Sequence, residues 1–221
     1  ASRAGMAACC AMAILVCGLA GMVSGLLVTL AGIPAFIVTL AMMLVASGVA
    51  FLLAKGQSIY QVPESFVWLG RSEVLRVPCA VWLMFVLYAA AQVVMERTVV
   101  GRHIYAVGGN AEAARLSGVR VARVRTMTYV VSGLLAGLGG IVLASQLKSG
   151  APTYGQMYEL YVIAAVVVGG TSLAGGRGKV LGTLIGAFII AVIQNGMNLT
   201  GVESYTQKVV LGLVILAAVL L

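Results

Sequence analysis

Few side chains in this sequence could carry out acid–base, nucleophilic or metal chemistry. The 221 residues include no Asp, six Glu and a single His, His103, which lies among arginines. The four cysteines form no Cys-x-x-Cys pair, so small packing residues are a simpler interpretation than a zinc site or a disulfide framework. No serine has an evident base partner. We therefore expect neither an enzyme nor a protein that binds a metal or cofactor of its own.

A glycine-rich stretch, Gly175–Lys179, is similar to a phosphate-binding loop only at first sight. Leu173 stands where such a loop needs its first glycine, and Val180 replaces the Ser or Thr that would hold magnesium. A flexible turn between two apolar segments is the better interpretation. Any nucleotide chemistry would have to come from another chain.

The elements that position these residues are apolar segments. Hydrophobic residues make up 62% of the chain and charged residues 9%, whereas soluble domains carry about 25% charge. This excludes a soluble domain and, despite the net charge of +8, a nucleic-acid-binding module. Seven segments are apolar on every face, which predicts an all-α polytopic transmembrane bundle of about seven spans within one domain, residues 1–221. They cover residues 5–30, 34–54, 78–95, 126–147, 158–173, 180–199 and 205–221.

The distribution of arginine predicts the orientation in the membrane. Six arginines lie between Glu96 and Thr126, opposed only by Glu112: Arg97, Arg102, Arg115, Arg120, Arg123 and Arg125. Basic residues concentrate in cytoplasmic loops, so the loop 97–125 is predicted to be cytoplasmic. Counting spans from it places Arg177 and Lys179 inside, and residues 55–77 and 148–157 outside.

Three Gly-x-x-x-Gly patterns place pairs of glycines one turn apart on a helix face. This spacing lets two helix backbones approach closely, and it occurs in many polytopic proteins. Helix packing is therefore the expected role, with no further meaning for transport. The pairs are Gly21 with Gly25, Gly133 with Gly137, and Gly182 with Gly186.

A short helix is predicted inside the arginine-rich loop, over Gly109–Gly118. Asn110 is a favourable N-cap, and Gly118 can end the helix. Glu112 falls in the first turn and Arg115 near the last, where each suits the helix dipole. A helix this short is marginal alone and would gain stability by lodging in a partner's groove. The alternative is a solvated loop helix whose arginines only place this loop on the cytoplasmic side of the membrane.

Two stretches resemble one known family. Glu112-Ala113-Ala114-x-x-x-Gly118 matches the EAA-type signature of permease subunits of bacterial ABC importers. The longer stretches GRHIYAVGGNAEAARLSGV and VVVGGTSLAGGRGKVLGTLIGAFII are similar to permeases of the ribose/xylose/galactose group. The resemblance extends from about Ile33 to Leu221. Family members usually have about ten helices, so seven here would fit the loss of about three N-terminal spans.

The resemblance implies a pore-forming subunit in the bacterial inner membrane. A second permease chain, in a homodimer, would complete the path. Cytoplasmic ATPases that bind ATP and Mg²⁺ would drive transport, and a periplasmic sugar-binding protein would deliver the sugar. The ATPase would be contacted by a coupling segment within about 97–125, centred on Gly109, Asn110, Glu112, Ala113, Ala114, Arg115 and Gly118.

Polar residues within the spans are candidates for the substrate path. Gln194, Asn195 and Asn198 cluster in the predicted sixth span. Amides donate and accept hydrogen bonds, as sugar hydroxyls require. Hydrogen bonding between helices explains such a cluster equally simply, so both interpretations stay open.

The leading hypothesis is the permease of an ATP-driven importer of a monosaccharide or related polyol. A permease for branched-chain amino acids is the alternative within the same superfamily. A proton- or sodium-coupled secondary transporter is less well supported, because such proteins normally need an intramembrane carboxylate and no span has a charge near its centre.

Overall fold

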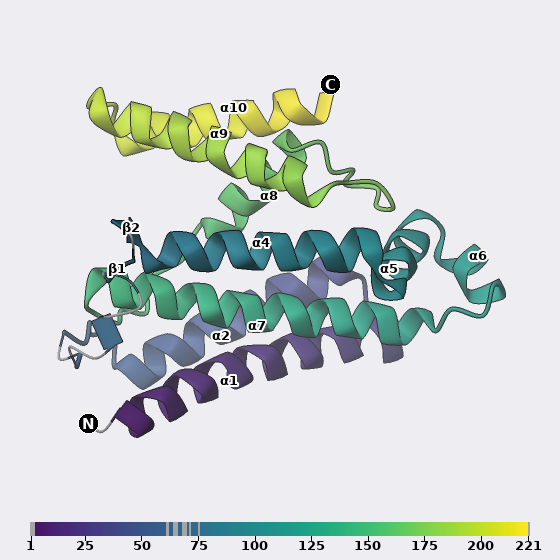
Figure 1. The fold of residues 1–221 in the computed structure, drawn as a ribbon, viewed down its shortest axis with the longest axis horizontal. Coiled ribbons are helices and arrows are strands. Elements are labelled where there is room, and N and C mark those ends of the chain that lie inside the picture. The colour runs from purple at the N-terminus through teal and green to yellow at the C-terminus, as the bar shows by residue number, and fades with distance from the viewer. Residues whose placement is uncertain are drawn as a thin grey trace. The chain divides into compact units, whose positions relative to one another are not determined.

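A helix occupies each of the seven predicted apolar segments, and the fold is all-α (Figure 1). The computed structural model describes residues 3–60, 62–63, 66–67, 70, 72–74 and 76–220. A two-stranded antiparallel hairpin pairs Glu73 with Pro78 and Val74 with Val77. The elements are α1 (Arg3–Leu30), α2 (Ala35–Ala54), β1 (Glu73–Val74), β2 (Val77–Pro78), α4 (Cys79–Arg97), α5 (Val99–Gly109), α6 (Ala111–Leu116), α7 (Val121–Leu147), α8 (Tyr158–Val168), α9 (Val180–Leu199) and α10 (Ser204–Leu220).

Five of these helices, α1, α2, α4, α7 and α9, are long and apolar enough to cross a membrane. The predicted span over 158–173 is wrong in length, because α8 ends at Val168 after 11 residues. Gly170 takes a left-handed φ of +79° directly after the helix, and Thr171 N donates to Val166 O at 3.1 Å. This is the geometry with which glycine ends a helix. Thus α8 is an apolar helix of about half the length of a span.

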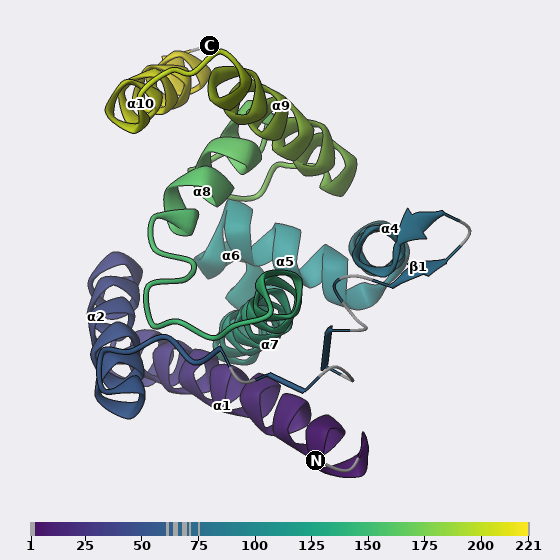
Figure 2. The same ribbon diagram turned by 90° about the vertical axis from the view of Figure 1, so that its left-hand side faces the viewer.

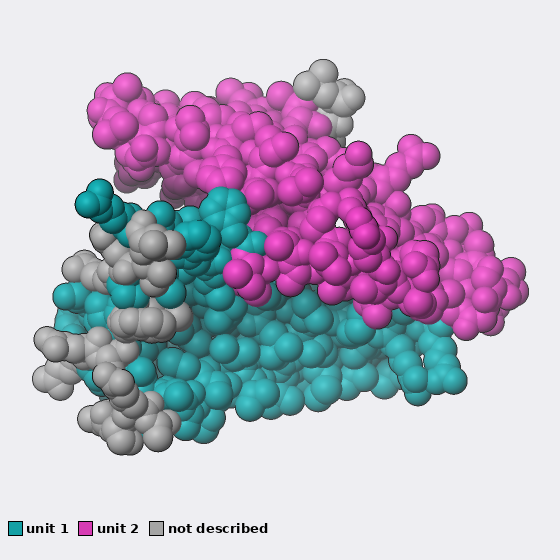
Figure 3. Space-filling view, in the orientation of Figure 1, with its two compact units in different colours: residues 1–85, 120–155 teal, residues 86–119, 156–221 magenta. Residues whose placement is uncertain are grey.

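The chain divides into two compact units, drawn in two colours in Figure 3. Unit 1 contains residues 1–85 and 120–155, and unit 2 contains residues 86–119 and 156–221. The chain passes between them within α4 and again near residues 119–120 and 155–156. The single domain over 1–221 stays a prediction.

In unit 1, α1 and α7 pack along their lengths, and they lie side by side both in Figure 1 and in Figure 2, where α7 is seen end-on. The two glycine pairs of these helices face one another: a Cβ added at Gly21 would collide with Tyr129 O, and one added at Gly133 with Cys17 O. Near one end, the Thr29 and Thr126 hydroxyls lie 3.2 Å apart. The predicted packing role of the glycine patterns is confirmed here.

The two segments predicted to lie outside meet at one end of unit 1. Ile59 and Gly150 exchange backbone hydrogen bonds of 2.8 and 2.9 Å. The Ser145 hydroxyl, fully buried, donates to Phe66 O and accepts from Gly70 N, both at 2.8 Å. Residues 61, 64–65, 68–69, 71 and 75 of the predicted external segment 55–77 lie outside the described residues. The contacts show that 55–60 and 148–150 share one end of the unit.

In unit 2, α8 packs against both α9 and α10. Ala164, Ala165, Ile190 and Leu211 form the buried core of this group. Gly182 and Gly186 of α9 face α8, where added Cβ atoms would collide with Gly169 O and Ala165 O. The third glycine pattern therefore also serves close packing.

Candidate functional site

The arginine-rich segment 97–125 is mostly helical, which corrects its interpretation as a loop with one short helix. After α4 ends at Arg97, α5 begins at Val99 with Thr98 as its N-cap. Thr98 Oγ1 accepts from Gly101 N at 3.4 Å and donates to Val94 O at 2.7 Å. Helix α7 begins at Val121, five residues before the predicted span. The Thr98 cap and the helical spacing of the apolar residues after it are signals that could have predicted α5.

The short helix predicted near Gly109–Gly118 is confirmed as α6, and both of its ends are capped. Asn110 Oδ1 accepts hydrogen bonds from Glu112 N and Ala113 N, each 3.0 Å long. Gly118 adopts a φ of +83°, with Gly118 N donating to Arg115 O and Val119 N to Ala114 O, each at 3.0 Å. This pair of bonds is the Schellman termination. Two well-formed caps fix a six-residue helix that has little intrinsic stability.

The two faces of α6 differ. Ala114 is 5% exposed and packs inward, so it is not available to a partner. Glu112, Ala113 and Arg115 are exposed, and Leu116 is 76% exposed. An exposed leucine beside a small alanine and two charges is a surface that a complementary protein groove could cover.

Glu112 and Arg115 form an ion pair within α6. Arg115 Nε donates to Glu112 Oε2 at 3.0 Å, and Arg115 Nη2 donates to Glu112 Oε1 at 2.6 Å. The hydrogen bond from Arg115 lowers the pKa of the Glu112 carboxyl and raises the pKa of Arg115. Both side chains are exposed, so the pair adds little stability. It leaves the charges available to exchange partners when another protein binds.

The end of α5 contacts the turn between α8 and α9. The Tyr105 hydroxyl donates to Gly178 O at 2.8 Å, and the backbone at Gly108 lies against Gly176. Beside this contact is a groove of about 410 Å³, whose lining includes the exposed cations Arg177 and Lys179. The two segments predicted to be cytoplasmic therefore share one side of unit 2. Which side faces the cytoplasm stays a prediction.

The structure separates the members of the predicted amide cluster on α9. Asn198 Oδ1 accepts from Gln207 Nε2 of α10 at 2.9 Å, and Gln207 Nε2 also donates to Val202 O at 2.9 Å. Gln194 and Gln207 line a small cavity of about 10 Å³ between α8, α9 and α10. Asn195 is exposed and does not line this cavity. Hydrogen bonding between helices thus accounts for the side chain of Asn198. For Gln194 and Asn195, a role in the substrate path stays a prediction from the sequence.

The sequence matches a protein family over residues 2–219. The family is described as the branched-chain amino acid transport system / permease component. The chain belongs to this permease family. It is therefore a multi-pass membrane protein of a transport system, as its long apolar helices also indicate.

Several relatives of this permease are named as sugar permeases. It is 46% identical over 204 residues to the ribose import permease protein of Escherichia coli K12 and 46% identical over 200 residues to that of Bacillus subtilis. It is 39% identical over 198 residues to the L-arabinose transport system permease protein of E. coli K12. Each match covers 90% of the chain and, in the same order, 64%, 62% and 60% of the relative. The chain thus spans less than two thirds of these relatives' lengths, and no solved structure matches it.

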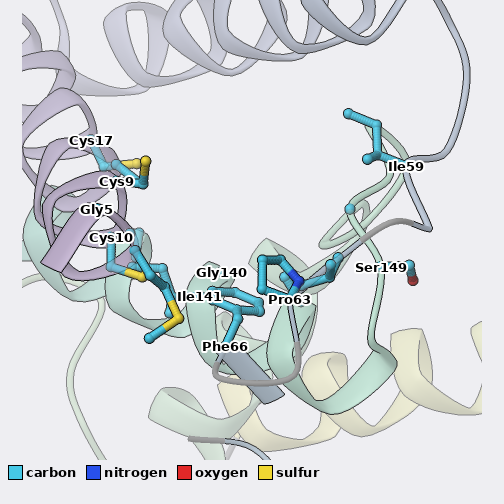
Figure 4. A pocket seen from close by; sticks show the side chains of 17 residues that line it. Gly5, Cys9, Cys10, Cys17, Ile59, Pro63, Phe66, Gly140, Ile141 and Ser149 are labelled. Atoms are coloured by element: carbon cyan, nitrogen blue, oxygen red, sulfur yellow. The ribbon is translucent and has the colours of Figure 1, made fainter. Parts of the chain in front are cut away.

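A second cavity of the permease, of about 580 Å³, lies in unit 1 and is lined by α1, α7 and the side chains of Ile59, Val62, Pro63 and Phe66 (Figure 4). Its wall is mostly glycine and aliphatic residues, with one aromatic ring, Phe66, and the thiols of Cys9, Cys10 and Cys17 on α1. The Ser149 hydroxyl at its edge lies 2.6 Å from the Tyr154 hydroxyl. Such a wall offers few hydrogen-bonding groups to a polar solute. We therefore do not assign this cavity to a sugar path.

Proposed function

We propose that this chain is the membrane-spanning, pore-forming component of an ATP-driven importer for a ribose-like monosaccharide. The observation that carries the proposal is the capped α6 helix, which lies in a sequence 46% identical to ribose import permeases. A permease that binds no nucleotide needs a surface through which an ATPase can act on it. Helix α6, with its exposed Glu112, Ala113 and Leu116, is that surface.

The other subunits of the transporter follow from this assignment. ATP and Mg²⁺ are bound by a separate cytoplasmic ATPase, a second copy of the permease completes the pore, and a periplasmic binding protein supplies the sugar. In this arrangement residues 97–125 face the cytoplasm. The concentration of arginine there supports this, as does the contact of α5 with the basic turn that holds Arg177 and Lys179.

The polar residues of α9 are proposed to take part in the path. Gln194 and Asn195 have amides that can exchange hydrogen bonds with sugar hydroxyls. Asn198 would act with Gln207, whose amide it already contacts. No charge lies in the middle of α9, which suits a neutral solute.

Transport by the reconstituted system tests the proposal. The full-length permease, its ATPase and its binding protein are placed in liposomes, and uptake of radiolabelled D-ribose, L-arabinose and L-leucine is compared. We expect ATP-dependent uptake of one of the sugars and none of leucine. Uptake of leucine alone would establish the branched-chain function that the family description names. Sugar uptake driven by a proton or sodium gradient without ATP would refute the ATPase assignment.

A further inference from the structure

Four glycines bring two backbone segments of unit 2 into direct contact. Gly108 and Gly109 end α5, immediately before the Asn110 cap of α6, and Gly175 and Gly176 lie in the turn between α8 and α9. A Cβ atom added at Gly108 would lie 2.7 Å from Gly176 N, and one added at Gly176 would lie 2.5 Å from Gly109 Cα. We call these four residues the glycine junction. Its backbones touch with no side chain between them.

A hydrogen bond one turn earlier in α5 ties the same two segments together. The Tyr105 hydroxyl donates to Gly178 O at 2.8 Å. Tyr105 and Gly108 are three residues apart and therefore share a face of α5. With two points of attachment, the end of α5 and the turn are held against rotation as well as separation.

The turn between α8 and α9 also makes close contacts that join it to both of these helices. Ser172 N donates to Arg177 O at 3.0 Å, which closes the turn on itself. A Cβ added at Gly178 would lie 2.7 Å from the Thr171 methyl group. Beyond it, Gly169 and Gly182 meet backbone to backbone. Continuous close contacts therefore run from the base of α6 to the α8–α9 pair.

We infer that the glycine junction transmits movement of α6 to α8 and α9, with Gly108, Gly176 and Tyr105 as positioning residues. The inference rests on the proposed docking of an ATPase on α6. Side chains can absorb a small displacement by changing rotamer, whereas two backbones in contact cannot, so a shift of the α5 end moves the turn with it. The junction thus links ATP hydrolysis to the helix that carries Gln194 and Asn195.

Two neighbouring alanine substitutions isolate the junction. Gly108→Ala places a methyl group 2.7 Å from Gly176 N, whereas at Gly109 the nearest atom to a new Cβ, Gly176 Cα, is 3.9 Å away, an ordinary contact. Both change glycine to alanine at the end of α5 and leave α6 unaltered. Tyr105→Phe removes only the bond to Gly178 O, with Tyr205→Phe on an exposed part of α10 as its control.

The measured quantity is D-ribose imported per ATP hydrolysed by the assembled full-length transporter. We expect Gly108→Ala to lower this ratio by roughly 2- to 30-fold while binding-protein-stimulated ATP hydrolysis persists. Tyr205→Phe should match the wild type, whereas Gly109→Ala and Tyr105→Phe should each lower the ratio less than Gly108→Ala does. A purely structural role would reduce assembly, hydrolysis and uptake together.

Equal ratios for Gly108→Ala and Gly109→Ala would overturn the inference. So would a proportional loss of hydrolysis and uptake. If Gly108→Ala fails to assemble, Tyr105→Phe decides: a lowered ratio supports the junction, and an unchanged ratio refutes it. Absence of sugar uptake by the wild type would instead refute the proposed function, so the two failures are distinguishable.

Discussion

Removing the N-cap of α6 should loosen this helix by a measurable amount. Asn110 Oδ1 accepts hydrogen bonds from two backbone amides, and Asn110→Ala abolishes both. Loss of such a cap costs about 1 kcal/mol, within a range of about 0.5–2 kcal/mol. A free energy of about 1 kcal/mol changes a folded-to-unfolded ratio about fivefold. In a six-residue helix little else resists that change.

Hydrogen–deuterium exchange of the full-length permease in nanodiscs measures the effect directly. Peptides that cover residues 111–117 should lose protection about fivefold in Asn110→Ala, as the cap energy requires. Asn110→Ser keeps a side-chain acceptor at the cap and should stay close to the wild type. Peptides from α1 serve as an internal reference, because α1 belongs to unit 1 and α6 to unit 2.

Docking provides a second measurement of the same effect. A partner that binds only the folded helix shows an apparent Kd raised in inverse proportion to the folded fraction. Affinity of the ATPase for Asn110→Ala should therefore fall by up to about fivefold. Unchanged exchange in Asn110→Ala, or an equal loss in Asn110→Ser, would show that the cap does not hold α6 and would refute the reasoning.

Four further predictions concern the same surfaces. Ala113→Trp places a bulky ring on the exposed face of α6, so binding-protein-stimulated ATP hydrolysis and uptake should fall together while membrane insertion stays normal; normal transport would rule out docking there. Asn198→Ala breaks the hydrogen bond between Asn198 and Gln207 of α10. Loss of transporter assembly would assign Asn198 to helix packing, whereas reduced sugar uptake with normal assembly and normal basal ATP hydrolysis would assign it to the substrate path. Cysteines introduced at Ser117 and Gln57 should react with impermeant reagents from opposite faces of sealed vesicles, and labelling from one face would refute the topology. The pKa of Glu112 is lowered in the folded protein, so its ion pair stabilises α6 fully at pH values above the ordinary carboxyl pKa of about 4.3. This stabilisation is lost as the pH falls through the lower pKa of the folded state. Hydrogen–deuterium exchange of α6, corrected for the pH dependence of the intrinsic exchange rate, should therefore rise only in that acidic range, and Glu112→Gln should abolish the rise.

Much of the fold could be predicted because apolar segments and glycine patterns act locally. The ends of α6 followed from Asn110 and Gly118, since caps depend on residues adjacent in sequence. The contacts between distant segments could not be predicted. Ser145 bonds to Phe66 and Gly70, and nothing around a serine in an apolar segment identifies partners more than 70 residues away.

The candidate site was predicted unevenly for the same reason. Spacing alone put Gln194, Asn195 and Asn198 into one cluster, but the partner of Asn198 is Gln207, which comes from the next helix. Likewise, Ala113 and Ala114 are equivalent in sequence, and only the three-dimensional structure makes one exposed and the other buried. The short length of α8 was missed, although Gly169, Gly170, Thr171 and Ser172 follow the apolar stretch directly and could have marked its end.

The brevity of α8 has a consequence for water. Eleven residues rise about 16 Å along a helix axis, roughly half of the hydrocarbon thickness of a bilayer. A chain that crosses the membrane at α8 must therefore take non-helical backbone into the remaining depth. Lipid tails cannot satisfy the amide and carbonyl groups of that backbone, so protein or water must do so. Directly after α8, Thr171 N donates to Val166 O at 3.1 Å, so this amide is satisfied within the chain. A crossing at α8 therefore requires that neighbouring protein covers the chain beside this helix, or that the bilayer is thinner or hydrated there.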